Sequence, residues 1–233
     1  TAAGDGPADR LVGTHAGDGP ADRVAATPAG IGTVDAAALF AGSEGTLAVA
    51  TGFEVGLVRL PASRALLVAH FDEALDPFRA VPVLLGTGAT AIELVDRTVL
   101  DLARQAPGYA DDLAIVQGLP AALLVVEYSG ASDAEVTAGL DAGTRALAGA
   151  GFHGAVVRAV DPGVQERVWR VRKVGLGILL GMRGDWKPVA GVEDTGVPPE
   201  ALADYMADVH RLMGDLGVRA GYYGHASSGC IHI

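Results

Sequence analysis

Ala122-Leu-Leu-Val-Val-Glu-Tyr128 and Ala155-Val-Val-Arg-Ala159 are short segments of mostly aliphatic residues, and a helical pattern lies between them. This helix begins at a capping box, in which Ser132 precedes Glu135 by three positions. Its apolar residues recur at helical spacing on one face, at Val136, Leu140 and Leu147. The stretch therefore predicts a strand, a helix and a second strand in succession.

The same order of elements occurs once before this stretch. We predict a strand at Ala65–Phe71, a helix at about Glu73–Leu85, a strand at Ala91–Val95 and a short helix from Arg97. Two strand-helix-strand units are typical of an α+β fold, a ferredoxin-like antiparallel sheet with helices on one face. We expect residues 65–159 to form one antiparallel sheet with at least two helices packed on a single face.

The N-terminal quarter of the chain has a different character. The octapeptide AGDGPADR occurs at residues 3–10 and again at 16–23, in a Gly- and Pro-rich segment that predicts loop or disorder. Residues 46–60, TLAVATGFEVGLVRL, predict two short strands or one bent strand, closed by Pro61. We therefore expect two domains, residues 1–60 and 61–233.

Two further helices are predicted in the C-terminal third. One covers about 164–180, and the other begins at Pro198 or Pro199 and stops at Gly217. His210 lies off the apolar face of the second helix, and we expect it to face solvent.

The composition is that of a globular chain. Of the 233 residues, 50% are apolar and 19% are charged, which allows a substantial buried core. No apolar run reaches the roughly 20 residues of a membrane helix, and the acidic N-terminus lacks a signal-peptide pattern. We expect a cytoplasmic protein without a transmembrane segment, and leave peripheral attachment to a membrane open.

Charge and cysteine content exclude several functions. The 17 basic and 28 acidic residues give a net charge of −11, which disfavours nucleic acid as a partner. The single cysteine, Cys230, excludes an intrachain disulfide and an all-cysteine zinc or iron–sulfur site within this chain. We interpret Cys230 as a small buried strand residue rather than a nucleophile.

The segment Gly224-His-Ala-Ser-Ser-Gly-Cys-Ile-His232 carries the clearest chemical signal. Its glycines and serines disfavour helix and predict strand, tight loop and strand. Imidazole is the commonest protein ligand of metals, and such a loop can bring two rings toward one point. His225 and His232 are therefore candidates for metal binding or catalysis, while two ordinary polar strand histidines remain the alternative.

Two other motifs are candidates for binding. The turn Gly42-Ser-Glu-Gly-Thr46 could donate backbone N–H groups to phosphate, or could simply be a tight turn capped by Ser43. Arg172 lies at the edge of an apolar helix face, which predicts a covered stem and an outward guanidinium.

Five blocks, taken in this order, give the chain a family resemblance from about Leu39 to Ile233. They are Gly42–Leu47, Glu93–Asp96, Trp169–Arg172, Val192–Pro198 and Tyr223–His232. The chain resembles FAD-linked oxidoreductases of the vanillyl-alcohol oxidase superfamily, in particular the C-terminal half of D-lactate and D-2-hydroxyacid dehydrogenases. The form of the histidine block resembles the branch that is fused to a downstream iron–sulfur domain.

The resemblance implies a role for each matching residue. It assigns FAD contacts to Gly42, Ser43, Glu44, Gly45 and Thr46, at the end of an FAD-binding domain. It implies that Arg172 binds the substrate carboxylate. It also implies that His225 and His232 bind a divalent metal (Zn or Mn) or orient the hydroxyacid. Apart from the resemblance, Lys187 could add a second positive charge near the substrate, with an ordinary solvated lysine as the alternative.

The resemblance also implies a fragment. The family's glycine-rich FAD loop, its acidic metal ligand and the histidine that follows that ligand are absent from this sequence. We therefore expect part of an FAD-dependent enzyme that oxidises a D-2-hydroxyacid such as lactate or glycolate, with an unidentified electron acceptor. A non-catalytic α+β module with structural histidines, or a flavoprotein acting on another alcohol, are the alternatives.

Arg172 discriminates among these hypotheses. A carboxylate site requires its guanidinium to point at the histidine loop, whereas a surface arginine would face solvent or pair with Glu166. We interpret Glu193 and Asp194 as structural acids at the end of a strand.

Overall fold

The computed structural model describes residues 36–106, 108–109, 111–173, 175–181, 185, 188–193 and 195–233. The chain divides into two compact units between Leu60 and Pro61. The identity of the first unit as the end of an FAD-binding domain stays a prediction. Lys187 and Asp194 lie outside the described residues.

The described part of the first unit contains one short helix, α1 (Ala36–Phe40), and then the Gly42–Thr46 turn. Residues 47–60 are not in a strand, which contradicts the strands predicted at 46–60. The apolar side chains of this segment are largely exposed, for example Phe53 at 85% and Val58 at 92%. A strand needs a neighbour for its backbone hydrogen bonds, and no described strand pairs with this segment.

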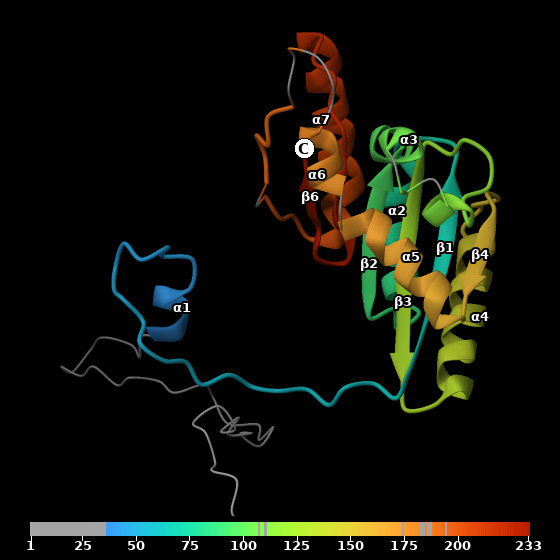
Figure 1. The fold of residues 1–233 in the computed structure, drawn as a ribbon, viewed down its shortest axis with the longest axis horizontal. Helices are drawn as coiled ribbons and strands as arrows, with labels where there is room; N and C mark the ends of the chain where they lie inside the picture. The colour runs from blue at the N-terminus through green and yellow to red at the C-terminus, as the bar shows by residue number, and fades with distance from the viewer. Residues whose placement is uncertain are drawn as a thin grey trace, which may run out of the picture. The chain divides into compact units, whose positions relative to one another are not determined.

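The second unit is built on a six-stranded antiparallel sheet (Figure 1). Its strands are β1 (Ser63–Phe71), β2 (Ala91–Asp96), β3 (Ala122–Gly130), β4 (Val156–Ala159), β5 (Tyr223–His225) and β6 (Cys230–His232). Their spatial order is β4-β1-β3-β2-β5-β6. The first four strands have the ferredoxin-like arrangement, which confirms the predicted α+β fold, and the β5–β6 hairpin extends the sheet beyond β2.

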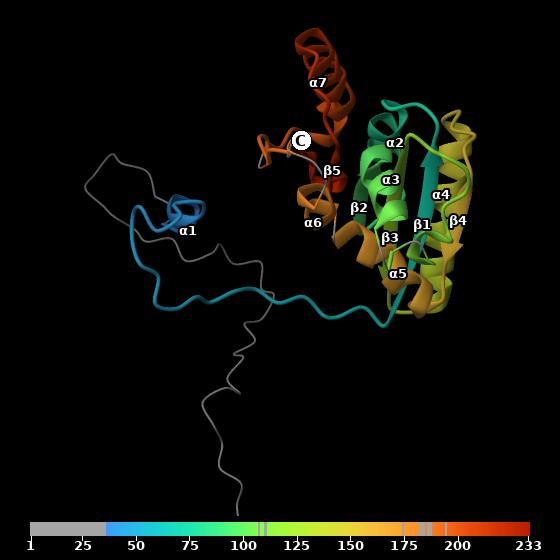
Figure 2. The same cartoon turned by 45° about the horizontal axis from the view of Figure 1, so that its top comes forward.

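One face of the sheet packs against α2 (Asp76–Leu85) and α4 (Asp133–Gly149) (Figures 1 and 2). Helix α7 (Leu202–Leu216) packs against α2 and contributes Leu202 and Met206 to the same core. Leu67 and Leu124, on neighbouring strands, are among the fully buried residues of this core. The expected helices on a single face are therefore present. The predicted capping box of α4 is also confirmed, with Ser132 Oγ accepting from Glu135 N at 3.3 Å and Glu135 Oε2 accepting from Ala131 N at 2.8 Å.

Helix α4 approaches β3 closely at Tyr128. The phenol ring occupies the space in front of Gly139 and Gly143, where any side chain would overlap it. Its hydroxyl forms a 2.6 Å hydrogen bond with Thr87 Oγ1, and burial raises the pKa of Tyr128 above its ordinary value. The small residues of α4 are thus required by an aromatic residue of the sheet.

The opposite face of the sheet is also covered, by α3 (Arg97–Gln105), α5 (Pro162–Lys173), α6 (Gly175–Leu180) and the 3₁₀ helix η1 (Asp111–Leu113). The structure adds this second layer to the helices predicted on one face. The reason is visible in β1 and β3, whose residues of both parities are apolar, a pattern typical of strands buried on both sides. The single helix predicted at about 164–180 is divided into α5 and α6.

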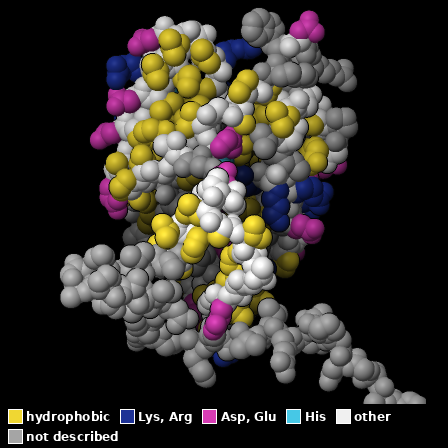
Figure 3. Space-filling model, turned by 90° about the vertical axis from the view of Figure 1, so that its left-hand side faces the viewer, with side chains coloured by type: hydrophobic (Ala, Val, Ile, Leu, Met, Phe, Trp, Pro, Cys, Tyr) yellow, Lys and Arg dark blue, Asp and Glu magenta, His cyan; other side chains and the backbone are white. Residues whose placement is uncertain are grey.

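Hydrophobic side chains are mixed with charged ones on the surface shown in Figure 3. Among the large apolar residues of α7, Leu212 and Leu216 are more than half exposed. Within the described ranges, no helix combines the length and the apolar content that crossing a bilayer requires.

Candidate functional site

The two motif histidines lie on the β5–β6 hairpin. His225 ends β5, His232 ends β6, and a short 3₁₀ turn, η3 (Ala226–Ser228), lies between the strands, as predicted. Gly229 closes the turn with φ 71°, and a Cβ at this position would overlap the carbonyl oxygen of Val197. The two imidazole ring centroids are 5.6 Å apart, with their planes at 80°.

The register of the hairpin places an aromatic residue beside these histidines. Tyr223 pairs directly with His232, and their ring centroids are 4.9 Å apart. Because side chains alternate along a strand, Tyr223, His225 and His232 share one face of the hairpin. Burial is the main cause that raises the pKa of Tyr223, so its phenol stays protonated at neutral pH.

Arg172, near the end of α5, reaches the same place. Its Nε donates to Glu93 Oε2 at 2.8 Å, and its Nη2 lies 2.7 Å from the same oxygen. Its guanidinium carbon lies 5.5 Å from the centroid of the Tyr223 ring. The side chain is 11% exposed and bonds to Glu93, which also contacts His225, rather than to Glu166. The guanidinium therefore reaches out from the helix toward the histidine hairpin and not into solvent.

Glu93 joins Arg172 to the histidine hairpin. Strand β2 pairs with β5, with Leu94 opposite Gly224, so Glu93 comes to lie beside His225. Glu93 Oε1 lies 2.9 Å from His225 Nδ1. A carboxylate only accepts hydrogen bonds, so Nδ1 carries the proton and Nε2 is the ring nitrogen not engaged by Glu93.

Sequence reasoning did not assign Glu93 to the site. The available signal was a carboxylate in the middle of an apolar strand, because a buried charge requires partners. Its two partners are 79 and 132 residues away in sequence. The pairing of β2 with β5, which brings them together, could not be read from local patterns.

A second carboxylate lies against His232. Glu193 Oε2 is 3.0 Å from His232 Nδ1, a distance typical of an ion pair, although the atoms are not aligned for a hydrogen bond. Backbone bonds hold this segment beside β6, among them Ile233 N to Val192 O at 2.9 Å. Glu193, interpreted from the sequence as a structural acid, thus contacts a candidate site residue.

The Gly42–Thr46 turn belongs to the first unit. Gly42 and Gly45 have φ of 76° and 78°, and Glu44 has φ 49°. Thr46 closes the turn, donating to Ser43 O from its backbone N at 2.8 Å and from its hydroxyl at 2.6 Å. Its assignment to FAD stays a prediction.

Metal binding by this chain also stays a prediction. Among the described residues, no group of three or more His, Cys, Asp or Glu side chains has the geometry of a metal site. The imidazoles of His225 and His232 form a pair without a third ligand in that set.

His210 differs from the sequence expectation. It lines a pocket of about 250 Å³ with Phe78, Asp96 and Tyr222, and its ring stacks on Tyr222 with a centroid distance of 4.6 Å. Its Nε2 is buried and has no hydrogen-bond partner among the described residues, so the prediction that His210 faces solvent is wrong.

Asp96 lines the same pocket. Burial raises the pKa of Asp96 to about 6, and its oxygens accept from the backbone N atoms of Val99 and Tyr222. Asp96 is therefore a structural cap of α3.

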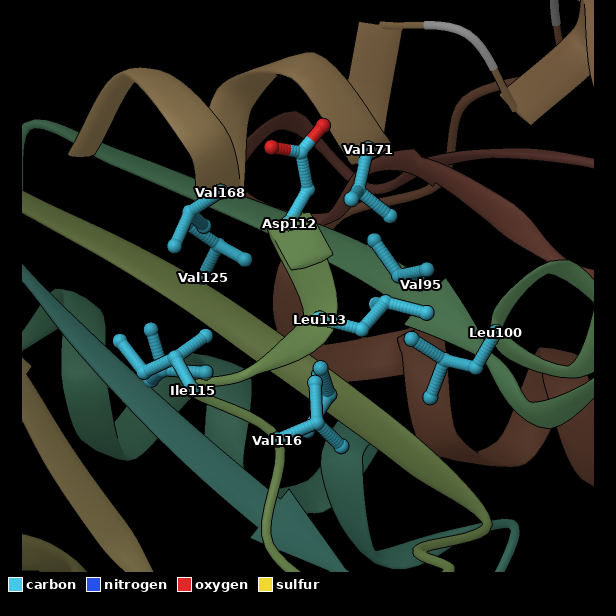
Figure 4. Close-up of a pocket in the computed structure, with 11 residues that line it drawn as sticks. Val95, Leu100, Asp112, Leu113, Ile115, Val116, Val125, Val168 and Val171 are labelled. Atoms are coloured by element: carbon cyan, nitrogen blue, oxygen red, sulfur yellow. The ribbon is translucent and has the colours of Figure 1, made fainter. Parts of the chain in front are cut away.

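A smaller cavity lies between η1, α5 and the sheet (Figure 4). Its volume is about 20 Å³, and its lining is apolar apart from Asp112. Asp112 Oδ2 lies 3.4 Å from Arg170 Nη1. The volume suits about one water molecule, so this cavity is not a substrate site.

Comparisons with known proteins identify the family of this chain. Residues 60–233 match the family described as FAD linked oxidases, C-terminal domain. D-2-hydroxyglutarate dehydrogenase of Escherichia coli (strain K12) is 32% identical over 197 residues, covering 80% of this chain and 19% of that protein. The enzyme of the same name from Pantoea ananatis (strain AJ13355) is 31% identical, and the match covers 80% of this chain and 19% of that protein. The one from Pseudomonas putida (strain KT2440) is 29% identical, and the match covers 77% of this chain and 18% of that protein. The chain thus spans about a fifth of these curated relatives.

Proposed function

We propose, from the premise that this chain belongs to the FAD-linked oxidases through their C-terminal domain, that it forms the substrate side of an FAD-dependent D-2-hydroxyacid dehydrogenase. The observation that carries the proposal is the cluster of Arg172, Glu93, His225 and His232 on one sheet edge. It combines a cation for a carboxylate with two imidazoles for a hydroxyl, the two functional groups of a 2-hydroxyacid.

Arg172 is proposed to bind the substrate carboxylate. A guanidinium has five N–H donors, and Glu93 engages the edge formed by Nε and Nη2. Among the described residues, the edge formed by Nη1 and Nη2 has no hydrogen-bond or ion-pair partner besides Glu93, and its geometry matches a carboxylate bidentately. The guanidinium carbon also lies 5.5 Å from the centroid of the Tyr223 ring, within cation–π range.

His225 and His232 are proposed to act on the substrate hydroxyl. In His225 Nδ1 bonds to Glu93, which favours the tautomer with Nε2 unprotonated, and in His232 Nδ1 lies 3.0 Å from Glu193. An unprotonated Nε2 can accept the hydroxyl proton while the Cα hydrogen leaves with two electrons, and the substrate becomes a 2-oxoacid. The flavin, when bound, supplies the hydride acceptor.

The same two nitrogens are suited to a divalent metal. A metal-bound histidine usually directs its other ring nitrogen to a carboxylate or carbonyl. His225 does so toward Glu93, and Nδ1 of His232 lies 3.0 Å from Glu193 without hydrogen-bond alignment. Zn or Mn, held by His225 and His232, would lower the pKa of the coordinated hydroxyl. The two ring centroids are 5.6 Å apart, so both imidazoles lie close enough to take part in one binding site.

The remaining assignments concern the whole protein. We assign FAD contacts to Gly42, Ser43, Glu44, Gly45 and Thr46, and residues 1–60 to the end of the FAD-binding domain. An iron–sulfur domain would lie outside this chain. The electron acceptor of the enzyme is not assigned. The relatives' name makes D-2-hydroxyglutarate the first substrate to test, and its second carboxylate would suit Lys187.

The test uses the full-length protein that contains this chain, purified with FAD. Reduction of a dye acceptor is measured with D-2-hydroxyglutarate, D-lactate and glycolate, and with L-2-hydroxyglutarate as the stereochemical control. We expect turnover of at least one D-acid or glycolate and little with the L-acid. Failure of all of them to bleach the flavin would contradict the proposal and favour a non-catalytic module.

A further inference from the structure

We infer that Glu93 is the positioning residue of the substrate site, a role that rests on the function proposed above. It fixes the guanidinium of Arg172 and the imidazole of His225 relative to each other, using one carboxylate oxygen for each. No described residue other than Glu93 contacts both side chains through hydrogen bonds.

The burial of Glu93 requires charged and hydrogen-bonded partners. Its side chain is 12% exposed, and the neighbouring residues of β2, Ile92 and Leu94, are fully buried in the apolar core on the other face. An ionised carboxylate in this position is unfavourable unless charged and hydrogen-bonded partners surround it. Arg172 and His225 supply these partners, so neither can move without leaving the carboxylate unsatisfied.

The two carboxylate oxygens of Glu93 bind different residues. Oε2 accepts from the Nε edge of Arg172 at 2.8 Å, which leaves the opposite edge of the guanidinium pointing away from Glu93. Oε1 takes Nδ1 of His225 at 2.9 Å, which directs Nε2 away from Glu93. Both residues are thereby oriented before the substrate binds. Glu193 differs, because it contacts His232 but not Arg172.

Glu93→Gln can keep only one of these two contacts, and it leaves the size of the side chain almost unchanged. A carboxamide has one accepting oxygen and one donating NH₂ group. If the oxygen faces Arg172, the NH₂ group faces His225 and forces the other tautomer. If the oxygen faces His225, the NH₂ group opposes the donors of Arg172. Either outcome loses one of the two contacts.

The first measurement needs no catalysis. In the ¹⁵N-labelled 233-residue chain at mildly alkaline pH, long-range ¹H–¹⁵N spectra report the tautomer of His225, and the Arg172 Nε–H signal reports its exchange with water. We expect the Nδ1–H tautomer and a protected Nε–H in the wild-type chain, and loss of at least one of them in Glu93→Gln. Glu166→Gln, the same change at an exposed position on α5, is the matched control and should alter neither.

The second measurement uses the FAD-loaded full-length protein. Glu93→Gln should lower kcat/KM for the best 2-hydroxyacid by roughly 10- to 100-fold, with a higher KM from a loosened Arg172 and a lower kcat from a misdirected His225. Glu166→Gln should stay within about twofold of wild type, as surface changes usually do. If Glu93→Gln fails to fold, Glu93→Asp, which retains the charge but is too short to reach both partners, replaces it in both measurements.

The outcomes separate the two hypotheses. If Glu93→Gln has wild-type spectra and wild-type kinetics, the positioning role is overturned, whether or not the enzyme oxidises hydroxyacids. Where Glu93→Asp is used in place of Glu93→Gln, unchanged spectra and kinetics of that variant have the same consequence. A wild-type protein without hydroxyacid turnover overturns the proposed function, and the spectra still decide whether Glu93 orients Arg172 and His225.

Discussion

Glu93 Oε2 lies 2.8 Å from Nε and 2.7 Å from Nη2 of Arg172, so a residue of β2 holds one edge of a guanidinium from α5. This contact explains why an arginine is suited to the position. A guanidinium can bind Glu93 on one edge and a substrate carboxylate on the other, whereas an ammonium group is a compact point charge without two planar edges.

Arg172→Lys should therefore weaken turnover of a 2-hydroxyacid by the full-length enzyme. We expect a loss of about 1 to 3 kcal/mol of transition-state binding, because a charge-assisted bidentate pair is replaced by a weaker contact. Steady-state kcat/KM measures it. Arg167→Lys, at an exposed position on the same helix, is the control. Unchanged kinetics in Arg172→Lys would remove this residue from the substrate site.

Gly143→Ala should destabilise the second unit. The added Cβ would overlap Tyr128 Oη and lie 3.3 Å from Leu67 Cδ1, so α4 or the ring must move. Overpacking of this kind costs about 1 to 3 kcal/mol, measured as a lower free energy of unfolding in urea. Gly149→Ala, in the last turn of α4 with open space around its Cβ, is the matched control and should be neutral or slightly stabilising. Equal unfolding midpoints would contradict the packing argument.

Local patterns predicted the parts of the fold that local interactions determine. The capping box of α4 and the strand-helix-strand order are specified by neighbouring residues, and both are present. The second helical layer depends on α5 folding back over the sheet, which no local pattern specifies. The strands predicted at 46–60 did not form because β-propensity without a pairing partner does not make a strand.

The candidate site was likewise predictable from the sequence only where local patterns determine it. The spacing of His225 and His232 was visible in sequence, and the turn that brings their rings together was predicted. Glu93 was missed because its importance depends on two long-range contacts. The contact of Arg172 with Glu93 could not be predicted from the helix pattern, because Glu93 lies on β2, 79 residues away in sequence.

The 233-residue chain should bind FAD weakly or not at all. The Gly42–Thr46 turn is one wall of the flavin site implied by the family resemblance, and one short turn offers few donors to the cofactor. Flavin absorbance after gel filtration with excess FAD measures the retained fraction. A stoichiometric yellow complex would contradict this expectation.

His70 should make the stability of the chain depend on pH. It is 5% exposed, its Nδ1 lies 3.0 Å from Ala155 O, and its Nε2 accepts from Gln117 N at 3.0 Å, a fully bonded neutral ring. Burial lowers the pKa of His70 below its ordinary value of 6.5. As pH falls below about 6.5, the unfolded chain takes up a proton that the folded chain does not, so the free energy of unfolding falls.

The measurement is urea unfolding at about pH 7 and about pH 5, where one such proton contributes up to about 1.4 kcal/mol per pH unit. Asp96, with its pKa raised to about 6, acts in the opposite direction below that pH, and the lowered pKa of His210 acts in the same direction as His70. Both contributions cancel when wild type is compared with His70→Gln, which should lose stability less steeply on acidification. His153→Gln, at an exposed position, should retain the wild-type slope. Equal slopes for wild type and His70→Gln would refute the assignment.

The last prediction concerns the metal. Calorimetric titration of the chain with Zn²⁺ or Mn²⁺ should show weak binding, because catalytic zinc sites use at least three protein ligands and the described residues provide the pair His225 and His232. His225→Ala and His232→Ala should each abolish that binding, since one imidazole alone holds an ion poorly. His153→Ala, which removes an exposed histidine elsewhere, should leave it unchanged. Tight binding that survives His232→Ala would show that the ion is held outside the β5–β6 hairpin.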